Sequence, residues 1–214
     1  MITTTISYDI ALRKTGLEVN KIRLDDLKDV ITDVTENLQP ITTQFPDLLM
    51  FVVQDKQIQV TVQDELVAIK NTSTDFNEND ITLLAKLSQE LNKNIPESLE
   101  AYGVNLNFVF AYKDTKPVKK IVGYINENAL IKDGLFTSRI ATASFLVSEE
   151  VEDGKRQLQF IPGFDKKWQI TPQVKVNANA HFDKDTLPTI SNLTKLVAQL
   201  HQDYVQRFSK LEEA

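Results

Sequence analysis

Alternating hydrophobic and polar residues predict β-strands along much of the chain. Residues 6–12 alternate apolar with polar side chains, as expected of a half-buried strand. Residues 48–71 predict a three-stranded antiparallel meander, and its middle strand, 57–63, sets aliphatic residues on one face against amides and threonine on the other. The strongest strand pattern is Val104–Tyr112. Further strands are expected at 139–149, 156–162 and 167–182. Pro172 should break or bulge the last of these.

Apolar residues spaced three and four apart predict three main helices, near 24–38, 78–95 and 187–211. Asn77 or Asn79 is placed to cap the second helix, because an Asn side chain there can accept a hydrogen bond from a free backbone amide. The last helix should bury one continuous apolar stripe. This stripe consists of Leu193, Val197, Leu200, Tyr204, Phe208 and Leu211.

The order of these elements predicts an α+β protein with antiparallel sheet, either one large sheet or two smaller ones, packed against the three helices. Residues 1–214 are long enough to form a single domain with its own core. A polar, proline-containing connector at 113–120 is the best candidate boundary between two subdomains, 1–112 and 121–214. A short helix is expected at Asn126–Lys132.

Composition excludes several functional classes. The chain has no cysteine, six glycines and two histidines, so it lacks thiolate chemistry, cysteine-ligated zinc and the common glycine-rich nucleotide fingerprints. With 24 basic and 30 acidic residues, its net charge of −6 argues against nonspecific binding of nucleic acid. No signal-peptide pattern and no membrane-spanning run is visible, so we expect a cytoplasmic protein that does not contact membranes. No cofactor is expected.

Two alternatives to a binding protein remain open. An enzyme of unknown class would use His201, at the edge of the last helix's apolar stripe, with nearby carboxylates. A nucleic-acid-associated accessory protein would use the lysines of residues 113–132, which Tyr112 and Tyr124 flank. No metal site is expected, because His181 and His201 have no third histidine or cysteine beside them and the acidic run at 149–153 is typical of a solvated hairpin tip.

The order of elements resembles that of a poorly characterised, sporadically distributed prokaryotic α+β family. Three segments carry the resemblance: Gln57–Val60, Val104–Tyr112, and the helical segment from Leu200 and His201 through Tyr204 to Phe208. The family supplies no established activity, so the resemblance implies the fold alone. The sheet-plus-helix layout is also similar to that of SecB-like export chaperones.

The polar faces of the predicted strands are rich in amides and nearly free of charge. Side chains of this kind suit a surface covered by another chain or a peptide, where hydrogen bonds matter and a bare charge is costly. The predicted contact residues are Gln57, Gln59, Thr61, Asn105, Asn107, Lys175, Asn177 and Asn179, with His201 as a further candidate. We therefore expect a soluble, non-enzymatic binding or assembly protein that acts through its sheet, on a protein partner or as a homo-oligomer.

Overall fold

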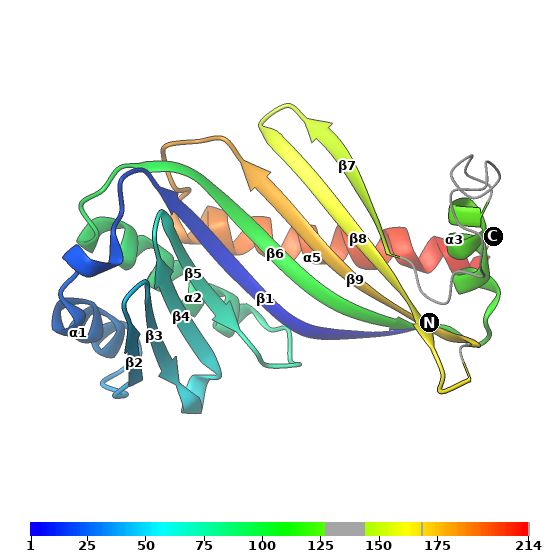
Figure 1. Cartoon of the computed structure of the whole chain (residues 1–214), viewed down its shortest axis with the longest axis horizontal. Coiled ribbons are helices and arrows are strands. Elements are labelled where there is room, and N and C mark those ends of the chain that lie inside the picture. The colour runs from blue at the N-terminus through cyan, green and yellow to red at the C-terminus, as the bar shows by residue number, and fades with distance from the viewer. Residues whose placement is uncertain (127–143, 168, 214) are drawn as a thin grey trace.

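A computed structural model, which describes residues 1–126, 144–167 and 169–213, contains one antiparallel sheet of nine strands in the order β2-β3-β4-β5-β1-β6-β9-β8-β7 (Figure 1). The α+β prediction is confirmed. The strands are β1 (Ile2–Lys14), β2 (Ile41–Phe45), β3 (Leu48–Val53), β4 (Ile58–Gln63), β5 (Leu66–Asn71), β6 (Leu99–Ala111), β7 (Phe145–Val151), β8 (Gly154–Phe164) and β9 (Ile170–Phe182). The helices are α1 (Leu24–Val34), α2 (Glu78–Asn94), α3 (Lys116–Asn126) and α5 (Ile190–Glu213), with short 3-10 turns at Val19–Lys21 and Gln54–Lys56.

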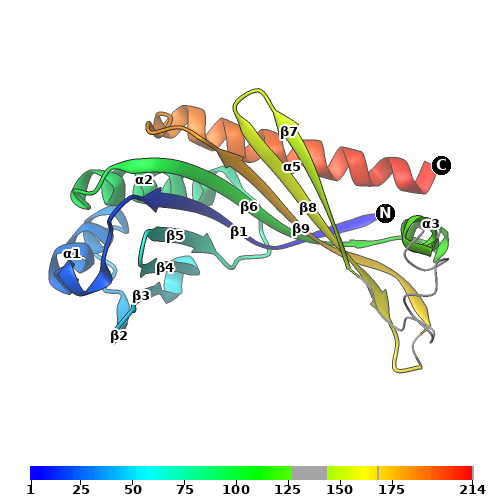
Figure 2. The same ribbon diagram turned by 45° about the horizontal axis from the view of Figure 1, so that its top comes forward.

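The helices cover one face of the sheet. Helix α2 packs on β1 and β5, α5 packs on β6 and on α2, and α1 packs on α2. In Figure 1, α2 and α5 lie behind the strands, and Figure 2 shows them as a layer above the sheet. We call the face under these helices the covered face and the opposite one the open face.

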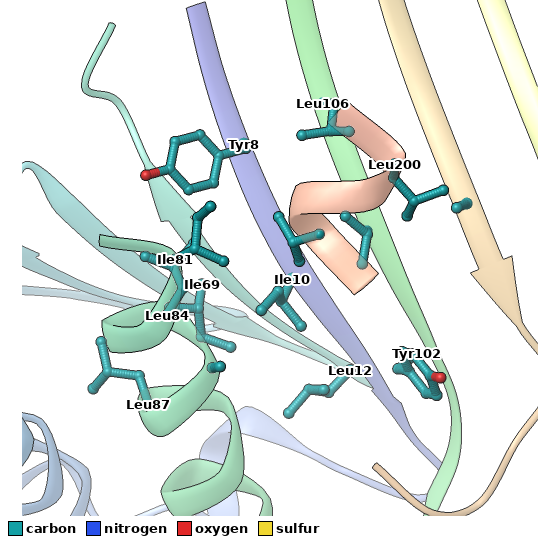
Figure 3. Close-up of a cluster of buried hydrophobic side chains, with 14 of the residues drawn as sticks. Tyr8, Ile10, Leu12, Ile69, Ile81, Leu84, Leu87, Tyr102, Leu106 and Leu200 are labelled. Atoms are coloured by element: carbon teal, nitrogen blue, oxygen red, sulfur yellow. The ribbon is translucent and has the colours of Figure 1, made fainter. Parts of the chain in front are cut away.

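The main core lies between the covered face and the helices. Figure 3 shows its centre, where side chains of β1, β5 and β6 meet those of α2 and α5. The labelled members are Tyr8, Ile10, Leu12, Ile69, Ile81, Leu84, Leu87, Tyr102, Leu106 and Leu200, all at most 3% exposed. The predicted stripe of the last helix is buried from Leu193 to Phe208, and Asn77 caps α2 by accepting a bond from the Asp80 amide at 3.0 Å.

A buried lysine caps the C-terminus of α2. The Lys14 ammonium donates hydrogen bonds to the carbonyl oxygens of Asn92, Ile95 and Glu97, at 3.2, 2.8 and 2.5 Å. These carbonyls lie at and just beyond the helix C-terminus, where no intrahelical amide is left to donate to them. Burial lowers the pKa of Lys14, while the nearby Glu97 carboxylate opposes that shift.

The structure corrects several details predicted from sequence. Strand β2 was not predicted, and helix α3 begins at Lys116, inside the segment expected to be a connector. Strand β9 continues through Pro172, whose carbonyl accepts a bond from the Tyr112 amide at 2.8 Å. The bulge predicted at Pro172 is confirmed against β8: Pro162 pairs with Val174 and Phe164 with Ile170, so residues 171–173 of β9 lie opposite Gly163 alone. Beyond Asn126, the short helix expected at 126–132 falls outside the described residues.

Candidate functional site

Strand register brings polar side chains from distant parts of the sequence into one row on the open face. In the order of the strands from β4 to β7, this row is Gln59, Lys70, Asp9, Asn105, Asn179, Gln157 and Ser148, each directly opposite the next. The neighbouring row is Ser7, Asn107, Asn177, Gln159 and Leu146. Residues directly opposite each other in a sheet are close enough for their side chains to interact.

Hydrogen bonds join these side chains across the strands. The Asn105 amide donates to the Asp9 carboxylate at 2.5 Å, and the Asn179 amide donates to the Asn105 carbonyl oxygen. In the neighbouring row, Asn107 donates to Ser7 Oγ at 3.1 Å and Asn177 donates to Gln159 Oε1 at 3.0 Å. The bonds hold the amide planes in fixed orientations, which limits the conformational entropy that a ligand would have to remove.

These residues line a groove with a volume of about 320 Å³. Its walls come from β1, β6, β9, β8 and β7. The lining residues, which we call the amide groove, are Asp9, Asn105, Asn107, Leu146, Gln157, Gln159, Asn177, Ala178 and Asn179. The side-chain oxygen of Asn177 is buried and accepts no bond from any residue that the structure describes. A buried acceptor without a donor is costly, so the Asn177 oxygen lowers the stability of the folded chain at this wall of the groove.

Asp9 is the acidic residue of the groove. Burial raises the pKa of its carboxyl, while the bond from Asn105 and the charge of Lys70 both act to lower it. The groove therefore holds a poorly hydrated carboxyl group whose ionised form is stabilised by the Asn105 amide and by the charge of Lys70. Such a side chain costs stability and is more typical of a functional position than of a solvated strand.

The structure brings only some of the sequence-predicted contact residues into this groove. Asn105, Asn107, Asn177 and Asn179 line it. The other predicted strand residues share the open face but do not line the groove; they are Gln59, Thr61 and Lys175. Gln57 precedes β4, in a left-handed backbone conformation with a φ of 52°, so its place in a strand was a wrong prediction.

His201 lies on the covered side of the sheet, apart from the amide groove. Its ring stacks on Phe76 with the centroids 3.7 Å apart, and its Nε2 shares a hydrogen bond with Thr5 Oγ1 at 3.0 Å. Burial lowers the pKa of His201 to about 4, so the ring is neutral near pH 7. In the described part of the chain no carboxylate is bonded to it.

The remaining candidate groups are dispersed or paired. His181, on the open face, pairs with Asp183 at 2.9 Å. Among the described residues, no cluster of three or more histidines and carboxylates could hold a metal ion. The acidic hairpin residues reach neighbouring elements, where Glu149 pairs with Arg207 at 3.3 Å and Asp153 with Lys184 at 2.9 Å.

The lysines of the connector surround a second hollow of about 430 Å³, at the start of α3 and the end of α5. Lys113, Lys116 and Lys120 share this hollow with Asp114 and Glu212, so its charge is mixed. Lys132 lies outside the described residues. No helix in the described part of the chain is long and apolar enough to cross a membrane.

Sequence reasoning missed the contributions of Ser7, Asp9, Gln157 and Gln159. All four occupy polar positions of strands that the sequence predicted. The alternation of apolar and polar residues was therefore the only signal that these side chains lie on the open face. Their meeting depends on β1 pairing with β6 and β9 pairing with β8, and these registers join residues up to 100 positions apart in sequence.

Comparison with known proteins adds little to this geometry. No family model matches the sequence, and no curated protein matches it. Among solved structures, the chain is similar to a rolling circle replication initiator protein from Geobacillus stearothermophilus, with 12% sequence identity and a TM-score of 0.35. The alignment covers 92% of this chain and 79% of that chain. A likeness of this strength supports no argument about fold or function, and the resemblance to the prokaryotic α+β family stays a prediction from sequence.

Proposed function

We propose that this protein is a binding protein, without enzymatic activity of its own, that holds an uncharged, extended polypeptide segment in the amide groove. The observation that carries this proposal is the row of carboxamides from β6, β8 and β9 around a hollow of about 320 Å³. A carboxamide offers both donors and an acceptor, as a peptide group does, so a lining of amides is complementary to a polypeptide backbone.

The charge of the groove favours an uncharged segment. Asp9 is the charged side chain in the lining, and burial already disfavours its ionised form. An anionic ligand would lose hydration on entering the groove and would gain no cationic partner among the lining residues. A cationic ligand would find only Asp9, whose ionised form is disfavoured by burial. A neutral segment loses only its hydrogen bonds to water, and the fixed amide side chains offer donors and acceptors that can replace them.

The two alternative functions lack comparable support. An enzyme built on His201 would need a substrate next to its ring, but Phe76 and Thr5 occupy the positions beside it. A nucleic-acid-binding protein would need a predominantly basic surface, whereas Asp114 and Glu212 share the hollow with the lysines.

A selection from a library of linear peptides tests this proposal. The peptides should contain no Asp, Glu, Lys or Arg, and a selected peptide is then titrated into the wild type and two variants by calorimetry. Asn177→Asp places a charge inside the groove and should weaken binding about tenfold or more, equivalent to about 1.4 kcal/mol. Gln59→Glu places the same charge on the same face but outside the groove, opposite Lys70, and should leave the affinity within about twofold.

The proposal fails if no uncharged peptide is enriched, or if both variants weaken binding equally. A denaturation curve for each variant separates loss of binding from loss of folding.

A further inference from the structure

The N-terminal half of β1 forms an unpaired edge within the sheet. Strand β5 pairs with β1 only from Tyr8 to Arg13, whereas β6 pairs with β1 from Ile2 onward. Figure 1 shows this half of β1 running beyond the end of β5 along the rim of the sheet. In the described part of the chain, no other strand pairs with Ile2–Ile6.

The backbone groups of Thr3 and Thr5 point outward from this edge. The Tyr112 amide bonds to Pro172 of β9, so alternate residues back along β6, such as Phe110 and Phe108, also direct their backbone groups to β9. Their partners in β1 are Thr3 and Thr5, which therefore direct their amides and carbonyls away from β6. Among the described residues, no backbone group bonds to them there.

The edge also exposes apolar side chains. Ile2 is 72% exposed and Ile6 is 37% exposed, and Ile2 lies with Thr4 toward the open face, because their partners in β6 alternate with the buried Phe108 and Phe110. A register shift between Thr5 and Ser7 accommodates Ile6 as an extra residue in the strand. Natural edge strands usually carry Lys, Pro or inward-pointing charges that block pairing, and residues 2–6 have none.

The sequence of this edge is complementary to itself. Ile2-Thr3-Thr4-Thr5-Ile6 reads the same in both directions. Antiparallel pairing of two copies about Thr4 would place Thr3 opposite Thr5 of the second copy, and both residues have outward backbone groups. It would also place Ile2 opposite Ile6, which covers the exposed side chains of both.

We propose that two copies of the chain form a two-fold symmetric dimer by pairing their Ile2–Ile6 edges. The two-fold axis passes between the Thr4 residues and runs perpendicular to the sheet, so both open faces lie on the same side of a continuous sheet. This proposal does not depend on the amide groove, although the dimer would present two grooves side by side and so bind a repeated ligand with avidity.

Strand β2 offers a matched control, because it is the outer edge of the sheet beside β3 and has a similar composition. Its sequence is Ile41-Thr42-Thr43-Gln44-Phe45, with Ile41 55% and Phe45 51% exposed. Pro40 and Pro46 bracket it, and its sequence is not symmetric. Thr43, at its centre, is exposed as Thr4 is.

Single cysteines test the register, because the wild type has none. In the proposed dimer the Thr4 residues form a non-hydrogen-bonded pair with Cα atoms about 4.5 Å apart, within the range of a disulfide. Under mild oxidation, Thr4→Cys should convert to a disulfide-linked dimer, and Thr43→Cys should stay largely monomeric on a non-reducing gel. In light scattering, the wild type should have the mass of a dimer and Thr4→Lys the mass of a monomer. The substitution sets two lysine ammonium groups directly opposite each other in the proposed interface, and like charges there repel.

Circular dichroism and a denaturation curve confirm that Thr4→Lys still folds, as expected for an exposed side chain. The proposal is overturned if the wild type has a monomer mass at every concentration. It is also overturned if Thr43→Cys forms the disulfide as fast as Thr4→Cys. These measurements use untagged protein, because Glu212, close to the C-terminus, pairs with the Met1 amino group beside the edge.

Discussion

Strand β9 presents two different surfaces from one backbone. Toward the helices it places Val174, Val176 and Ala178, which are at most 2% exposed. Toward the open face, the alternate residues Asn177 and Asn179 join side-chain bonds that cross from β1 to β8. The covered face is held by apolar contact, which requires shape but little direction. The open face is held by hydrogen bonds, which require direction and leave polar capacity for a ligand.

The difference shows where this protein departs from the pattern of a solvated sheet. An open face that only meets water usually carries charged side chains, whose hydration is strong and whose orientation does not matter. Here a row of carboxamides is bonded side by side, and a carboxylate at one end is partly removed from water. We therefore attribute stability to the covered face and, under the proposed function, recognition to the open face.

The largest effect is expected on the covered face, from Leu200→Ala. The Leu200 side chain is 1% exposed at the centre of the α5 stripe, so its truncation removes apolar contacts and leaves a cavity. The free energy of unfolding should fall by about 2–5 kcal/mol. Urea denaturation measures it, and a loss below about 0.5 kcal/mol would contradict the assigned packing.

Lys14→Met should also destabilise the covered side, by about 2 kcal/mol, because three carbonyls at the end of α2 lose their donor. Methionine keeps the length and apolar stem of the side chain, so the change tests the hydrogen bonds rather than the packing. Hydrogen exchange should become faster in the last turn of α2. Unchanged stability and exchange would show that the ammonium has no capping role.

The pH dependence of stability should report His201. Its pKa is about 4 in the folded protein and about 6.5 in an unfolded chain, so the unfolded state binds the proton first as the pH falls. The contribution of His201 to the free energy of unfolding is fully present above about pH 6.5. It is lost as the pH falls toward 4, by up to about 2 kcal/mol. His201→Gln should flatten this part of the profile, and a profile that keeps its slope would contradict the assignment to His201.

The smallest effect, and the one of opposite sign, is expected on the open face. Asp9→Asn removes a poorly hydrated carboxylate but keeps an oxygen that can accept the bond from Asn105. The free energy of unfolding at pH 7.5 should rise by about 1 kcal/mol, which is the behaviour expected where function is favoured over stability. A clear loss of stability would instead assign Asp9 a structural role.

Local patterns in the sequence predicted most of the covered face. The stripes of α2 and α5 follow helical spacing, and strands such as β4 and β6 follow simple alternation, because burial on one side imposes a period. Strand β2 was not predicted, because Ile41–Phe45 has polar residues at its centre and lies between two prolines. The start of β1 at Ile2 was not predicted, because the extra residue at Ile6 interrupts the alternation of apolar and polar residues.

The amide groove was only partly predictable. Composition identified Asn105, Asn107, Asn177 and Asn179 as unusual, because a charge-free polar face can be seen in any single strand. Composition could not predict that Asn105 contacts Asp9, because that contact depends on the register of β1 against β6, which long-range packing decides.

The central claim is that a ligand binds the amide groove, and NMR of the side-chain amides tests it most directly. An uncharged peptide selected against the wild type is added to ¹⁵N-labelled protein, and the NH₂ signals of asparagine and glutamine are followed. The account predicts that the signals of Asn105, Asn107, Asn177 and Asn179 shift with the peptide concentration while that of Gln59 stays in place. Shifts confined to residues outside the groove would contradict it.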